Sequence, residues 1–213
     1  MNNDQYRNID RVNVGSGPDC LMPGKWSNVD IRDFPGVDFV MDVTKKWPFK
    51  NLAYIYGEHF IEHLMIDQAL QFLKCAGKSL RAKGKIRLST PNLSWVIASH
   101  FNLNSNSSEE TVNDTLRTNR AFHGWGHHFL WSEQMLRFVL ESMHFIDVEF
   151  FSYGISNDPE LKNLERHSGY CHFMGFPSVL IVEASRGNDE IRIEPAMNKM
   201  LFEEYSRHVL SGH

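Results

Sequence analysis

Short apolar runs separated by turns dominate the first ninety residues of the chain. The runs of strand length lie at 9–14, 26–30, 37–41, 52–56 and 85–90. Over 66–82, by contrast, apolar residues recur at three- and four-residue steps, the period of an amphipathic helix. Strands that alternate with a helix or a loop are typical of a parallel sheet with right-handed crossovers. The pattern therefore predicts an α/β fold.

The middle of the chain departs from this pattern. Residues 99–128 are polar, and a stretch of this length between core elements is typical of a lid or a disordered loop. Ser132 is placed to cap the helix that follows. Two more strands are predicted at 145–151 and 179–184, separated by a polar excursion at 157–167. Because no long apolar helix joins these two strands, we expect them to pair antiparallel at one edge of the sheet.

The C-terminal 27 residues are charged at first and then amphipathic. Apolar residues there recur at four-residue steps, at Met197, Leu201, Tyr205 and Val209. Such a helix either packs on the domain or contacts a second copy of the chain, as a homodimer would. We therefore expect one domain over residues 1–185, with a lid-like insertion at about 99–128, and a helical extension over 186–213.

Composition narrows the class of protein. At 213 residues with 42% apolar and 23% charged residues, the chain fits one soluble domain. A net charge of −4 without a basic cluster argues against nucleic acid as a partner. No apolar run approaches 18 residues and the N-terminus lacks the features of a signal peptide, so we expect no membrane partner and a cytoplasmic location. The odd number of cysteines (Cys20, Cys75 and Cys171) indicates neither a disulfide framework nor a zinc knuckle.

Candidate chemistry begins at the end of the first strand. Gly15-Ser16-Gly17 follows Val14 directly, and the next strand ends on Asp30. Glycines here let the chain turn tightly and let a ligand approach amide groups that a Cβ would shield. An acid at the next strand tip can accept both hydroxyls of a ribose. The alternative is a plain glycine turn beside a surface aspartate.

Several segments, in order along the chain, resemble class I S-adenosylmethionine-dependent methyltransferases, and among these the small bacterial-type enzymes of the type 11 kind. The matching segments are 12–17, 26–30, 41–43, 56–64, 84–92 and 128–132. The resemblance covers roughly residues 9–185. It implies a Rossmann-like, seven-stranded, mostly parallel sheet with an antiparallel last strand and helices on both faces. It also implies methyl transfer from S-adenosyl-L-methionine, and the absence of a basic patch suggests an O or N atom of a small-molecule or glycan-type acceptor.

The resemblance also implies which residues hold the cofactor. They are Gly15, Ser16, Gly17, Asp30, Ile31, Asp42, Val43 and Glu58. Gly15 and Gly17 would admit the methionine end, Asp30 would hold the ribose, and Asp42 would hold the adenine amino group. Glu58 would line the pocket or neutralise the sulfonium region.

The chain departs from the usual pattern after the glycine loop. Only thirteen residues separate Gly17 from Asp30, against about twenty in a dinucleotide fold. Pro18 and Pro23 further oppose a helix there. We therefore expect the first helix to be cut to a turn or so, which weakens the argument for a helix dipole at this site.

Histidines beyond the fourth strand are candidates for catalysis. His59 and His63 would share one helical face at their four-residue spacing. An unperturbed pKa of about 6.5 suits a general base, which is needed only if the acceptor arrives protonated. His59 is the candidate base, while His63 is a candidate substrate contact or a capping or core histidine. Glu62 is expected to be a solvated or capping carboxylate.

A second histidine group follows the polar stretch. The residues predicted to gate or contact the acceptor are His123, Trp125, His127 and His128. The alternatives are a packed loop or a set of metal ligands. Because no Cys or acidic residue lies at a convincing spacing, no metal is expected.

Two rival functions remain open on the sequence alone. A nicotinamide oxidoreductase would need a third glycine, but Cys20 follows Gly15-x-Gly17-x-x. A binding or partner protein could keep the fold without turnover. The presence of both Asp30 and Asp42 argues against this second alternative.

Overall fold

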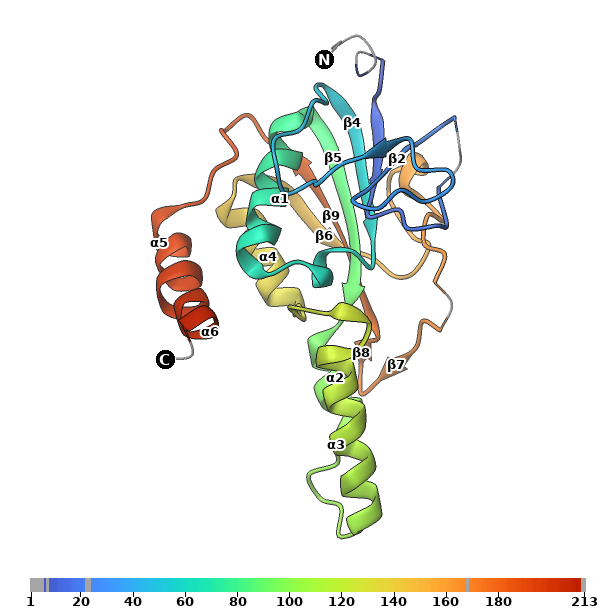
Figure 1. Cartoon of the computed structure of the whole chain (residues 1–213), viewed down its shortest axis with the longest axis vertical. Helices are drawn as coiled ribbons and strands as arrows, with labels where there is room; N and C mark the ends of the chain where they lie inside the picture. Colours follow the sequence, from blue (N-terminus) through green and yellow to red (C-terminus); the bar gives the residue numbers. More distant parts are fainter. Residues whose placement is uncertain (1–5, 7, 22–23, 168, 212–213) are drawn as a thin grey trace.

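A computed structural model describes residues 6, 8–21, 24–167 and 169–211, so Pro23 and its predicted effect lie outside the described residues. Seven strands form one sheet in the order β3-β2-β1-β4-β5-β9-β6 (Figure 1). The strands are β1 (Arg11–Val14), β2 (Ser27–Asp30), β3 (Phe39–Val40), β4 (Leu52–Glu58), β5 (Leu80–Pro91), β6 (Phe145–Phe150) and β9 (Val179–Arg186). A small hairpin, β7 (His172–Phe173) with β8 (Phe176–Pro177), stands apart from it.

The pairing confirms the predicted topology. Neighbouring strands from β3 to β5 are all parallel, whereas β9 is antiparallel to both β5 and β6. The last strand is therefore the antiparallel one, and it lies between β5 and the edge strand β6. The sheet is Rossmann-like and mostly parallel, with the carboxyl ends of β1, β2 and β4 at a common edge.

The helices next to the sheet follow the apolar periodicity. Helix α1 (Ile66–Ser79) buries Ile66, Leu70 and Leu73, and it ends three residues before the predicted limit because β5 begins at Leu80. Helix α4 (Glu133–Ser142) begins after Ser132, whose Oγ accepts a hydrogen bond from the amide of Met135 at 3.2 Å. That contact confirms the predicted cap.

The two faces of the sheet are covered differently. Helices α1 and α4 share one large apolar core with the strands (Figure 1). The other face has a smaller cluster around Trp26 and Tyr56, to which Leu161 in the 3-10 helix η4 (Pro159–Leu161) belongs. Among the residues that the structure describes, cover by helices is therefore substantial on one face and limited to a single 3-10 turn and loops on the other. The short β1–β2 connection leaves no room for a full helix, as expected.

A row of polar side chains crosses this second face. The strand register aligns Asn28, Asn13, Tyr56, Arg87 and Glu183 on neighbouring strands. Nδ2 of Asn13 donates to Oδ1 of Asn28 at 2.9 Å. The guanidinium of Arg87 is fully buried and forms an ion pair with Glu183, so the row keeps its buried charge paired.

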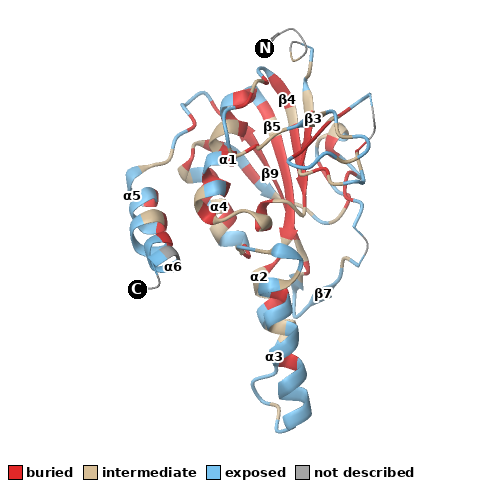
Figure 2. Cartoon of the chain, in the orientation of Figure 1, coloured by how far each residue is buried: buried red, intermediate tan, exposed pale blue. Residues whose placement is uncertain are grey.

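The polar stretch at 99–128 is mainly helical, which corrects the alternative of a disordered loop, while a role as a lid stays a prediction. Helix α2 (Leu93–His100) leads to α3 (Ser108–His123) and the 3-10 turn η3 (Gly124–Gly126). The two helices extend beyond the sheet, and most of α3 is exposed (Figures 1 and 2). Only Asp114 and Ala121 are buried in α3, so the helix has no apolar stripe from which its period could be recognised.

Of the predicted extension at 186–213, the part from Pro195 to Ser211 is helical, whereas residues 187–194 form no helix. The helical part runs through α5 (Pro195–Asn198), the π-helix η5 (Lys199–Ser206) and α6 (Arg207–Ser211). Met197 and Leu201 are buried against the domain, whereas Tyr205 and Val209 are 40% and 49% exposed. Packing on the domain thus accounts for half of the predicted stripe, and a contact with a second copy stays a prediction. Among the described helices, none has the length and apolar character needed to cross a membrane.

Candidate functional site

A cleft of about 1000 Å³ opens at the carboxyl ends of β1, β2 and β4. Open α/β sheets bind their ligands at this edge. The predicted site residues that line the cleft are Gly15, Ser16, Gly17, Asp30, Ile31, Asp42, Val43, Glu58, His59, His63, Trp125, His127 and His128. His123 does not line it, because it lies at the end of α3. Residues from distant segments complete the lining, notably Glu62, Arg166 and His167.

One side of the cleft, which we call the acidic wall, consists of Gly17, Asp30 and Asp42. The amide of Gly17 donates to Oδ2 of Asp30 at 2.9 Å, and the amide of Arg32 donates to Oδ1 at 2.9 Å. The Asp30 carboxylate is buried and held across the tips of β1 and β2. A carboxylate accepts at about four positions, so Asp30 retains capacity for a ligand.

The two glycines of the loop have different roles. Gly17 has φ +58°, and a Cβ added there would meet no atom within 4 Å, so the backbone is open to the cleft. Gly15 has φ +61°, but its Cβ would lie 2.3 Å from the ring of Phe60. The space at Gly15 is therefore occupied by a side chain of the protein itself.

Asp42 closes a short turn after β3. Its Oδ1 accepts from the amide of Thr44 at 2.9 Å and from the Thr44 hydroxyl at 2.6 Å. The hydroxyl bond is the main reason that the pKa of Asp42 is lowered. Nearby, the carbonyl of Val43 accepts from the indole of Trp47 at 2.7 Å, and Ile31 is 67% exposed. Ile31 thus presents an apolar surface beside two carboxylates.

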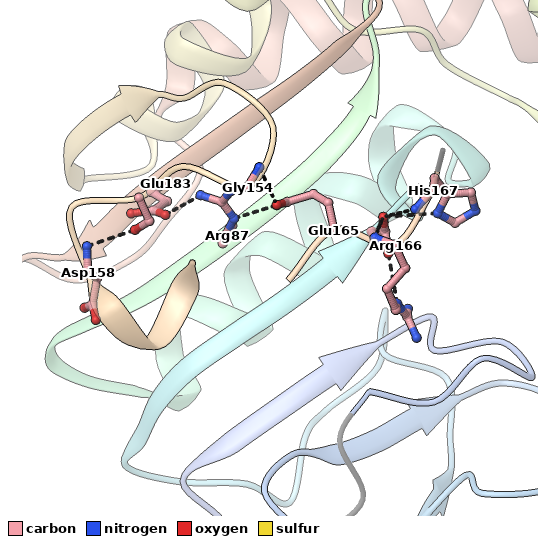
Figure 3. A network of polar contacts seen from close by, with 9 residues as sticks. Arg87, Gly154, Asp158, Glu165, Arg166, His167 and Glu183 are labelled. Atoms are coloured by element: carbon pink, nitrogen blue, oxygen red, sulfur yellow. Dashed lines mark hydrogen bonds and ion pairs between the residues drawn. The ribbon is translucent and has the colours of Figure 1, made fainter. Parts of the chain in front are cut away.

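Glu58 holds a distant loop against the strand end, and β4 extends through it, two residues beyond the predicted end. Figure 3 labels the loop residues Arg166 and His167. Oε1 of Glu58 accepts from the amides of Arg166 and His167 at 2.7 and 3.0 Å, and its Oε2 accepts from Nε of Arg166 at 3.1 Å. Burial alone would raise the pKa of Glu58, but these hydrogen bonds outweigh it and the pKa is lowered. Both oxygens are therefore engaged within the chain.

The segment after β4 is not the helix that the spacing of His59 and His63 suggested. His59 has φ +47°, and only Ile61–His63 forms a 3-10 turn, η2. The two imidazoles consequently have separate partners. Nδ1 of His59 lies 3.1 Å from Oε1 of Glu62, whereas Nδ1 of His63 lies 3.2 Å from the carbonyl oxygen of Gly126.

Glu62 is fully buried, which corrects the expectation of a solvated or capping carboxylate. Burial alone would lower the pKa of His59, but the hydrogen bond and the charge of Glu62 outweigh it and the pKa is raised. From the later histidine segment, the amides of His128 and Phe129 donate to the carbonyl oxygen of Glu62 at 2.8 and 3.1 Å. These bonds join the two histidine segments.

We call a second group of residues that line the cleft, His59, Glu62, His63 and His127, the imidazole wall. The rings of His63 and His127 lie 5.2 Å apart, centroid to centroid. Nδ1 of His127 lies 2.9 Å from the carbonyl oxygen of Ala121. Trp125, at φ +56° and 66% exposed, lies at the rim.

Sequence reasoning missed the buried charges that fix the loop held by Glu58. Nε of Arg87 donates to Oε1 of Glu165 at 2.7 Å, while its NH1 contacts Glu183 (Figure 3). Oε2 of Glu165 accepts from the amide of Gly154 at 3.1 Å. Glu165 immediately precedes the residues held by Glu58, so Arg87 and Glu58 fix the same stretch of that loop. An arginine in the centre of a buried strand was the available signal.

Comparison with solved structures identifies the fold. A methyltransferase from Archaeoglobus fulgidus described as dependent on S-adenosylmethionine superposes with a TM-score of 0.50 at 18% identity, over 84% of this chain and 87% of that one. A second, from Mesorhizobium loti, has a TM-score of 0.50 at 14% identity, over 85% and 92%. The chain has the fold of class I S-adenosylmethionine-dependent methyltransferases.

Other comparisons set the limits of this likeness. The CurJ carbon methyltransferase matches 86% of the chain with a TM-score of 0.47 and 11% identity, and the chain spans half the length of that structure. No family model matches the chain, and no curated protein matches it in sequence. The likeness is therefore one of fold.

Proposed function

We propose that the protein transfers a methyl group from S-adenosyl-L-methionine to an O or N atom of a small-molecule or glycan-type acceptor. The observation that carries this proposal is the acidic wall, where Gly17, Asp30 and Asp42 line one cleft at the strand ends. A surface turn with an unrelated aspartate would not bring these groups together. Open α/β sheets in general bind their ligands at this edge.

The residues fit a cationic nucleoside. The open space at Gly17 would admit the methionine end of the cofactor. Asp30 would accept hydrogen bonds from the ribose hydroxyls. The carboxylates that line the cleft are Asp19, Asp30, Asp42, Glu58, Glu62 and Glu165, against the guanidiniums of Arg32 and Arg166. This excess of negative charge favours a positively charged ligand.

The chain's main contribution to such a reaction is positioning. When bound, the cofactor supplies a methyl group on a sulfonium whose leaving group is already good. Fixing acceptor and donor in one cleft can lower a barrier by about 7–11 kcal/mol. Asp30 and Asp42 would orient the nucleoside, and the loop held by Glu58 would fix the neighbouring rim.

His59 is the candidate general base. Glu62 binds its Nδ1, which directs the ring and leaves Nε2 without a hydrogen bond among the described residues. His59 would accept a proton only from an acceptor that arrives protonated. Its removal is then expected to slow methylation without weakening cofactor binding.

Calorimetric titration with S-adenosylhomocysteine and, separately, with NADH tests the proposal. We expect saturable binding of the nucleoside thioether and none of the dinucleotide. No binding of S-adenosylhomocysteine, or binding of NADH alone, would contradict it. Transfer of labelled methyl to an extract fraction then distinguishes an enzyme from a silent binding protein.

A further inference from the structure

Three side chains able to bind a metal ion meet on the imidazole wall. One ligand atom from each of Glu62, His63 and His127 lies within 4.8 Å of the other two. All three residues line the cleft. A cation with metal–nitrogen bonds of about 2.0–2.1 Å keeps its ligand atoms roughly 3.0–3.4 Å apart. Small side-chain rotations would therefore close the three groups around an ion.

Hydrogen bonds leave the same nitrogen of both histidines available. Nδ1 of His63 faces the carbonyl oxygen of Gly126 at 3.2 Å, and Nδ1 of His127 faces that of Ala121 at 2.9 Å. A carbonyl oxygen only accepts, so Nδ1 carries the proton and the neutral ring presents a lone pair on Nε2. Ligating histidines commonly make this second bond, because it fixes the tautomer and the orientation of the ring.

The carboxylate supplies an independent observation. Glu62 is fully buried, its Oε1 bonds to His59, and its Oε2 has no hydrogen-bond partner among the described residues. A buried carboxylate oxygen without a partner is costly. A bound cation would satisfy it, while His59 would hold the other oxygen in place.

We propose that Glu62, His63 and His127 form a binding site for a divalent first-row transition ion. Two imidazoles and one carboxylate suit zinc, iron or manganese, whereas magnesium and calcium prefer oxygen ligands alone. The fold supplies the acidic partner that the sequence spacing near His127 lacked. Backbone bonds from His128 and Phe129 to Glu62 keep the two ligand segments together.

Such an ion would keep coordination positions open to the cleft, since the chain offers three ligands. An oxygen atom of the acceptor could bind there, and a metal-bound hydroxyl loses its proton more readily. This consequence rests on the proposed methyl transfer and favours a hydroxyl-bearing acceptor. The metal site itself does not depend on that function.

Metal titration of the untagged, chelator-treated, full-length protein tests the site. Co²⁺ binding is followed by visible absorption and Zn²⁺ binding by calorimetry. We expect one ion per chain and at least about a hundredfold weaker binding in His63→Ala and in His127→Ala. His123→Ala, close in sequence but outside the cleft, should bind the ion as the parent does.

Thermal unfolding of the metal-free proteins shows that the variants are folded. If an alanine variant is not folded, His63→Gln or His127→Gln replaces it, because glutamine keeps a donor for the backbone carbonyl. The proposal is overturned if the parent binds no ion at one per chain, or if the variants at positions 63 and 127 bind as the parent does. Nucleoside binding in the presence of chelator reports on the methyltransferase proposal separately.

Discussion

The acidic wall and the imidazole wall line the same cleft, but the residues that make contact in each are separated by different distances along the sequence. The acidic wall comes from one stretch of the sequence, and its main contact joins Gly17 to Asp30, thirteen residues apart. The imidazole wall joins Glu62 to the amide of His128, and it borders a loop that Glu58 holds from 108 residues away. Local sequence therefore determines the first wall, whereas the second exists only once the whole sheet has formed.

The largest expected effect comes from removing the buried charge that fixes the loop bordering the imidazole wall. Arg87→Met would leave Glu165 and Glu183 buried without their cation and should lower the free energy of unfolding by about 3–5 kcal/mol. Urea denaturation measures this loss. Arg81→Met, at an exposed position of the same strand, is the matched control. A loss below about 1 kcal/mol would mean that the buried network contributes little.

Asp30→Ala tests the acidic wall. Loss of charge-assisted hydrogen bonds should weaken S-adenosylhomocysteine binding about ten- to a hundredfold, or roughly 1.4–2.7 kcal/mol by calorimetry. Asp33→Ala, exposed and outside the cleft, should bind normally. Equal affinities for the two variants would remove Asp30 from the site.

Glu58→Gln tests, through its response to acid, the contact that holds the loop beside the imidazole wall. The folded pKa of Glu58 is lowered, so its contribution to stability is present above the unfolded value of about 4.3 and is lost as the pH falls through the folded pKa. At neutral pH we expect the variant to lose about 1–2 kcal/mol. Its stability should then fall less steeply than that of the parent in acid, as urea midpoints across pH would record. Parallel pH curves would contradict this account.

Gly17→Ala should give the smallest change in stability. A Cβ at φ +58° costs roughly 1 kcal/mol, although it meets no atom. Gly175→Ala shares the positive φ and the open surroundings but lies outside the cleft. Thermal unfolding should be affected equally in both, whereas only Gly17→Ala should weaken nucleoside binding. Unaltered binding would show that no ligand approaches this amide.

The sheet could be predicted because its strands are short apolar runs with glycine, proline or acidic residues at their ends. The acidic wall could be predicted for the same reason, since Gly17 lies in the turn directly after β1 and Asp30 ends the neighbouring β2. Helix α3 could not, because its buried residues are one acid and one alanine. The partners of Arg87 could not be predicted either, because the strand register places one of them and a remote loop supplies the other.

The histidines illustrate the same limit within the candidate site. Their residue type marked them as chemical candidates, but spacing wrongly placed His59 and His63 on one helical face. The positive φ of His59 turns the chain after β4 and sends the two rings to different neighbours. Backbone conformation thus decides which side chains can act together, and the residue types in this segment do not predict that conformation.

The exposed helix α3 has a consequence for the protein in motion. Its outer turns are held mainly by hydrogen bonds to the exposed loop that precedes the helix, so they can fray while the sheet stays folded. Amide protons near residue 110 should then exchange with deuterated solvent long before those of β4. Helix α3 would then open locally, and faster than the strands whose ends line the cleft.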